Sequence, residues 1–257
     1  MLSNRKLLLA SGLSLTLAAA TTHASPVTLQ VLGTGVTSGA EQNSSVFDFD
    51  PAADNTFAGS LPPGLGSDNP AGLWSVDALS ISGDVDPFVS LDFTVTNTSA
   101  TEDVEFTVTA FVPFPDGFDL GTDIVVGGSI SGSFADGNGD NTVTVSSIPG
   151  VPVYSGQVDG IEVLTLLGDP FSQTAVGGPF PPTGTIAQQV VGNPVVGVPE
   201  LEPTLLLDPN LLVTDSIGLD INFVLSPGDT ASFDAFFIAE VVPDPTSLAL
   251  LGLGSLG

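Results

Sequence analysis

The run Asp136-Gly137-Asn138-Gly139-Asp140-Asn141 has the residue types and spacing of a cation-binding loop. Its first, third and fifth positions are Asp136, Asn138 and Asp140, oxygen side chains of the kind that surround calcium, and the intervening glycines permit a tight backbone. The twelfth position holds Ser147 where an EF-hand loop has a bidentate Glu. The run therefore predicts either a calcium site or a polar hairpin loop with Asn, Asp and Gly turn chemistry.

Carboxylates are the main side chains available for catalysis in this chain. The chain has two basic residues, Arg5 and Lys6, one histidine, His23, and no cysteine. Beyond His23 there is accordingly no material for a Ser-His-Asp triad, a Schiff base or an ordinary zinc or iron site. A glycosidase with two carboxylates stays a remote alternative, because spacing alone identifies no acid of raised pKa in a cleft. We therefore expect a protein that is not an enzyme and has no cofactor, unless calcium binds.

The charge balance excludes several partners. The chain carries 29 acidic and two basic residues, for a formal net charge of −27. Such a surface repels nucleic acid and anionic lipid headgroups, since both are bound through cationic side chains. Repulsion among the carboxylates also predicts a fold that is more stable in salt or divalent cations than in dilute buffer.

Alternating apolar and polar residues predict an all-β protein. Ser90–Thr96 and Val104–Ala110 each alternate, and the short turn between them predicts a hairpin with one buried face. Ile217–Leu225 and Phe233–Phe237 form a second such pair, joined by Ser226-Pro227-Gly228-Asp229, which suits a type II turn. Frequent Gly and Pro, 30 and 21 residues, disfavour long helices.

The full pattern predicts one antiparallel β-sandwich over residues 25–241, with long Pro/Gly-rich loops. Residues 149–209 are rich in Gly and Pro, so we expect long connections over one face, with strands only at Ile161–Leu167 and Thr185–Val191. Further strands are predicted at Val27–Leu32, Ser45–Asp50, Leu73–Ser82, Asp123–Phe134 and Thr142–Val145.

The N-terminus predicts export. Arg5 and Lys6 precede the apolar run Leu7–Ala20, and small residues follow up to Ala24. This is the pattern of a secretory signal peptide over residues 1–24, with cleavage after Ala24. The apolar run is shorter than a membrane span, which disfavours an N-terminal anchor.

The C-terminus, residues 242–257, predicts a second targeting signal. Val242-Pro243-Asp244-Pro245 is followed by the uncharged run Leu248–Gly257. The arrangement resembles the PEP-CTERM sorting signal of Gram-negative bacteria, in which Val-Pro-Glu-Pro precedes a transmembrane helix and an Arg-rich tail. Here Asp244 replaces Glu, the basic tail is absent, and ten residues make about 15 Å of helix against about 30 Å of hydrocarbon. Either the gene product continues beyond Gly257 or this copy is degenerate; a Pro-rich linker with an apolar tail is the alternative.

The resemblance extends into the domain. Leu91–Ser99, Phe134–Asp140 and Phe223–Ala231 look like segments of exported β-sandwich proteins that carry this signal. The resemblance implies that Val242, Pro243, Asp244 and Pro245 are recognised by an exosortase after transient contact of the tail with the inner membrane. It also implies a structural protein of the cell surface or extracellular matrix, associated with exopolysaccharide or biofilm. A carbohydrate-binding module is the alternative, although the one Trp, one Tyr and mostly inward-alternating Phe residues offer few stacking platforms.

Overall fold

The computed structural model describes residues 26–39, 41–42, 46–49, 56–61, 65–66, 72–84, 88–114, 123–178, 181–196 and 216–241. Within these ranges the regular elements are all strands, and no helix there is long and apolar enough to cross a membrane. The predicted cleavage site at Ala24 and the predicted sorting residues Val242–Pro245 lie outside the described residues.

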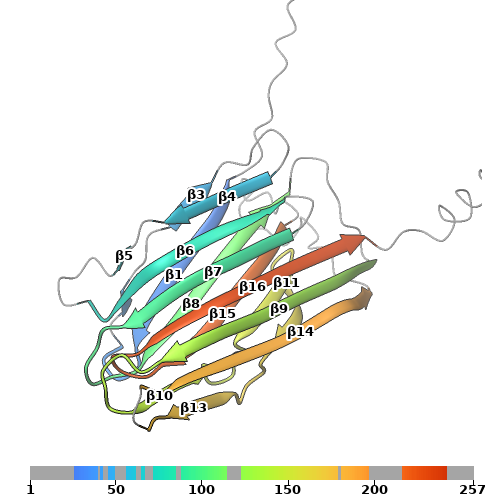
Figure 1. Cartoon of the computed structure of the whole chain (residues 1–257). Helices are drawn as coiled ribbons and strands as arrows, with labels where there is room; N and C mark the ends of the chain where they lie inside the picture. Colours follow the sequence, from blue (N-terminus) through green and yellow to red (C-terminus); the bar gives the residue numbers. More distant parts are fainter. Residues whose placement is uncertain are drawn as a thin grey trace, which may run out of the picture.

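Two antiparallel sheets pack face to face as a sandwich, which confirms the predicted fold class (Figure 1). Sheet A runs in the order β12 (Ile161–Leu166), β11 (Tyr154–Val158), β15 (Ser216–Leu225), β8 (Val104–Pro113), β1 (Val27–Gly35) and β2 (Glu41–Gln42). In addition β3 (Val46–Phe49) pairs with β1, β10 (Thr142–Ser146) pairs with β15, and β13 (Ser172–Val176) pairs with β10. Sheet B runs in the order β14 (Thr183–Val196), β9 (Asp123–Ala135), β16 (Thr230–Val241), β7 (Phe88–Asn97), β6 (Trp74–Asp84) and β4 (Thr56–Leu61), with β5 (Leu65–Gly66) beside β6.

Alternate residues of each strand point between the sheets and form the core. Phe106 and Phe223 come from sheet A, and Phe93 and Phe233 come from sheet B. The ring centroids of Phe223 and Phe233 are 4.6 Å apart, and those of Phe106 and Phe223 are 5.2 Å apart. The Phe223–Phe233 contact joins the two sheets, and all four rings are buried in the space between them.

The predicted hairpins are wrong, because each connects strands of different sheets. β7 pairs with β6 and β16, whereas β8 pairs with β1 and β15. The same holds from β9 to β10 and from β15 to β16. We call residues 98–103, 136–141 and 226–229 the crossing loops, because each passes from one sheet to the other. A period of two identifies which side chains are buried, and it carries no information about the neighbouring strand.

The strands predicted at Ile161–Leu167 and Thr185–Val191 are confirmed as β12 and β14, but the described part of residues 149–209 is otherwise different from the prediction. The segment includes four strands, β11 to β14, and they form one side of the sandwich instead of connections over a face. Position 156 in β11 favours Gly, because a Cβ there would lie 2.5 Å from the ring of Phe237 and would clash with it. Pro194 lies on β14, an edge strand, which is where a residue without a backbone N–H is best tolerated.

Candidate functional site

The predicted calcium loop is one of the three crossing loops, and its carboxylates bind the loop's own backbone. Asp136 accepts hydrogen bonds from the N–H groups of Gly139, at 2.7 Å, and Asn141, at 2.9 Å. Asp140 accepts one from the N–H of Thr142, at 2.8 Å. These bonds hold a tight turn in which Gly139 and Asn141 have φ angles of 80° and 69°.

Asn138 completes this loop by joining it to another. Its Nδ2 donates to the carbonyl oxygen of Pro227 at 2.6 Å, and its Oδ1 accepts from the N–H of Asp140 at 2.7 Å. The three predicted ligands therefore lie in one loop, with oxygens already engaged by N–H donors. The described residues include no group of three or more acidic or histidine side chains arranged to hold a metal. Calcium binding by Asp136, Asn138 and Asp140 stays a prediction.

Asp229, which the sequence places in a simple turn, lies beneath this loop. Its side chain is buried; it accepts a hydrogen bond from the N–H of Gly137, at 3.2 Å, and another from the hydroxyl of Ser226. Burial raises the pKa of Asp229, the two hydrogen bonds oppose the rise, and the nearby charges of Asp136 and Asp140 add to it. Gly228 before it has a φ of 72°, as the predicted type II turn requires at that position.

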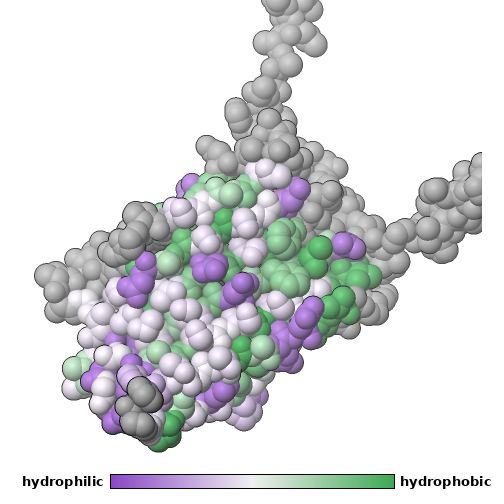
Figure 2. All heavy atoms as spheres, in the orientation of Figure 1, coloured by the Kyte–Doolittle hydropathy of each residue, from purple (hydrophilic) through white to green (hydrophobic). Residues whose placement is uncertain are grey.

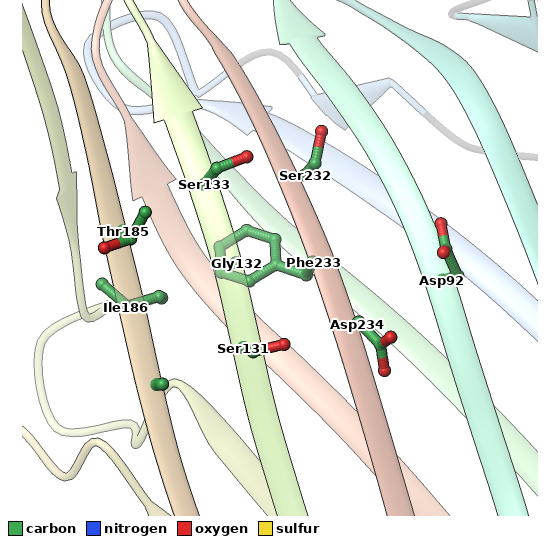
Figure 3. A pocket seen from close by; sticks show the side chains of 10 residues that line it. Asp92, Ser131, Gly132, Ser133, Thr185, Ile186, Ser232, Phe233 and Asp234 are labelled. Carbon is green, nitrogen blue, oxygen red and sulfur yellow. The ribbon is translucent and has the colours of Figure 1, made fainter.

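A second candidate site is an open groove of about 480 Å³ on the outer face of sheet B (Figure 3). It crosses β14, β9, β16 and β7, and two carboxylates on it, Asp92 and Asp234, are directly opposite each other in the β7–β16 ladder. Its lining residues are Asp92, Ser131, Gly132, Ser133, Thr185, Ile186, Ala187, Ser232, Phe233 and Asp234.

Hydroxyl groups surround this aspartate pair in rows set by the strand register. Ser131 is opposite Asp234, and Ser133 lies between Ser232 on one side and Thr185 on the other. Neighbouring strands are about 4.8 Å apart, so a ligand that lies across the strands meets a new polar side chain at each strand. Figure 2 shows much of this face in the pale colours of Ser, Thr and Gly. Carboxylates accept hydrogen bonds and hydroxyls both donate and accept, so the groove can bind a molecule rich in hydroxyl groups.

An aromatic pair lies near the groove on the same outer face. Phe236 is two residues beyond Asp234 on β16, and its ring centroid is 6.3 Å from that of Phe88 on β7. Both side chains are half-buried. The sequence prediction placed Phe residues mainly in the core, and Phe236 departs from it because it stands on the alternate, outward position between buried Ala235 and Phe237.

A carboxylate pair on the outer face of sheet A bears on the glycosidase alternative. Burial raises the pKa of Asp220, a hydrogen bond from Thr109 opposes the rise, and the charge of Glu162 adds to it. Each carboxylate has a neighbour on β11: Gln157 donates to Asp220, and Ser155 donates to Glu162 at 2.9 Å. These hydrogen bonds give both carboxylates a structural role, so the pair does not by itself indicate catalysis.

Comparison with models of known protein families finds no match. Searches of curated proteins and of solved structures find no match either.

Proposed function

We propose that this chain is an exported structural protein of the cell surface or extracellular matrix of a Gram-negative bacterium. In this proposal an exosortase processes it at Val242–Pro245, after secretion directed by residues 1–24. The PEP-CTERM resemblance supports the route. The groove on the outer face of sheet B supports the role, because it offers hydrogen-bonding groups to extracellular polysaccharide.

The groove favours an uncharged polysaccharide. Asp92 and Asp234 accept hydrogen bonds from sugar hydroxyls, while Ser131, Ser133 and Thr185 both donate and accept them. The 29 acidic residues of the chain repel an anionic polymer, and such a polymer would place its own charges beside the aspartate pair. The Phe88–Phe236 pair adds an apolar surface on which the face of a sugar ring can stack.

Affinity electrophoresis tests the binding role. We expect gels containing one of a panel of neutral polysaccharides to retard the protein relative to gels without polymer. In Asp92→Asn, Asp234→Asn the apparent dissociation constant should rise about tenfold, because two charged acceptors are lost. Glu105→Gln, Glu162→Gln on sheet A changes the charge equally and should leave retardation unchanged. Equal mobility of the wild type with and without every polymer contradicts the binding role.

The mass of the C-terminal peptide tests the export route separately. In protein isolated from its own cells we expect a terminus near Pro243–Pro245, with or without an adduct. Secreted material whose terminus is still Gly257 contradicts processing by an exosortase. This outcome leaves the groove experiment unaffected, so the two parts of the proposal can fail independently.

A further inference from the structure

The two neighbouring strands β13 and β14 carry no charge in this strongly acidic chain. The sequence contains no Asp, Glu, Lys or Arg from Pro170 to Pro199, although 29 acidic residues occur in the whole chain. This stretch includes β13 and β14, which lie side by side along one edge of the sandwich (Figure 1). β13 ends the β10 branch of sheet A, and β14 is the last strand of sheet B.

Among the described residues, the main chain of β14 has no partner strand on its outer edge. Within the described part of the chain β14 pairs with β9 alone, and the side chain of Gln173 donates to the carbonyl oxygen of Thr185 at 2.8 Å. A register shift between Val190 and Asn193, followed by Pro194, interrupts the far end. From Ile186 to Val191, the side chain of Gln188 accepts a hydrogen bond from the N–H of Leu167 at 2.6 Å, and no described strand pairs with the outer edge of the main chain. This uncharged edge can therefore pair with another strand.

The two most exposed large apolar side chains among the described residues stand on these strands. Val176 of β13 is 75% exposed and Val191 of β14 is 76% exposed, whereas Val36 and Phe111 elsewhere are 49% and 39% exposed. Uncharged edge strands with exposed valines are the features that natural proteins normally avoid at a free edge. Their concentration on one side indicates a surface that is covered by another protein.

We propose that this side is a self-association surface, on which β14 of a second copy pairs antiparallel with β14 across a two-fold axis. Two copies repel each other wherever carboxylates face carboxylates, and the uncharged strands β13 and β14 let them approach with little repulsion. An antiparallel pair of identical strands satisfies a two-fold axis, so the contact closes as a dimer. Val176 and Val191 then lose their exposure to water at the contact. The contact adjoins the groove, since Ile186 and Ala187 belong to both, but the dimer does not require polysaccharide to bind.

Sedimentation velocity of the purified secreted protein over a wide concentration range, in 0.15 M NaCl, tests the dimer. We expect a reversible monomer–dimer equilibrium that strengthens with added salt, because salt screens the remaining repulsion. Val191→Glu should raise the dimer dissociation constant at least about tenfold, since it places carboxylates within the contact. Val36→Glu introduces the same change far from β14 and should leave the dissociation constant unchanged.

Two further measurements complete the test of the dimer. Val176→Glu on the neighbouring strand should weaken the dimer in the same direction, which keeps the test valid if Val191→Glu fails to fold. Hydrogen exchange should show amides of residues 187–191 that become protected as protein concentration rises. A wild type that is monomeric at every concentration, equal weakening by Val36→Glu, or protection independent of concentration overturns the proposal. The last result would mean that another part of the same chain covers the edge.

Discussion

Replacing Asn97 with alanine is expected to lower the free energy of unfolding by about 3 kcal/mol, because several buried polar groups lose their partner at once. Asn97 ends β7 and is fully buried. Its Nδ2 donates to the carbonyl oxygens of Glu102, Leu225 and Ser226, at 2.9 to 3.0 Å, and its Oδ1 accepts from the N–H of Ser99. One side chain thus joins two crossing loops.

Urea denaturation with an unchanged m-value measures this loss. Asn138→Ala is the matched control, because it also removes a hydrogen bond to the loop at residues 226–229 but from an exposed position; its expected cost is below about 1 kcal/mol. Asn97→Asp keeps the acceptor and replaces the donor with a charge that faces carbonyl oxygens, so we expect a loss at least as large as for alanine. A loss for Asn97→Ala no greater than that of the control contradicts the role of Asn97.

Acidification from neutral pH toward the usual carboxyl pKa of 3.8 is expected to raise the melting temperature. Burial raises the pKa of Asp229 and of Asp220, so the native state binds more protons than the unfolded state between the usual value of 3.8 and the raised value. The stability from these groups is therefore fully present below 3.8 and is lost as pH rises through the raised value. Protonation also relieves the repulsion among carboxylates.

Asp169 has the opposite effect on stability at lower pH: its contribution is lost on acidification. Hydrogen bonds from the Ser147 hydroxyl and the Gly150 N–H lower the pKa of Asp169. Its contribution is present above the usual value of 3.8 and is lost as pH falls through the lowered value. The melting temperature should therefore pass through a maximum on the acid side of neutrality and decline at lower pH.

Thermal melts at two ionic strengths separate the two causes of acid stabilisation. At 1 M NaCl the screening length is about 3 Å, so repulsion among exposed carboxylates is largely removed while the contribution of buried Asp229 persists. In this salt we expect Asp229→Asn to flatten the pH dependence and Asp234→Asn, at an exposed position, to leave it unchanged. A wild-type melting temperature that falls steadily as the pH is lowered from neutral, with no maximum, contradicts the prediction.

The sequence by itself determined where the regularly alternating strands lie and which of their faces is buried, but it did not predict β4, β11 or β13. Ile217, Leu219, Ile221, Phe223 and Leu225 alternate in the sequence, and all five are buried in β15. Burial of alternate side chains is a local consequence of the pleat, so it can be read without knowing the partner strand. The absence of Lys, Arg, His and Cys after residue 23 likewise follows from composition alone.

The tertiary structure decided which strands pair, and with that it decided the candidate sites. Asp92 and Asp234 lie far apart in the chain and become neighbours only because β7 pairs with β16 instead of β8. Asn97 and Asp229 are typical turn residues in sequence, yet both are buried where crossing loops meet. Strand pairing depends on main-chain contacts between distant segments, and a local period of two is the same for every possible partner. The groove and the uncharged edge therefore exist only in the folded sandwich.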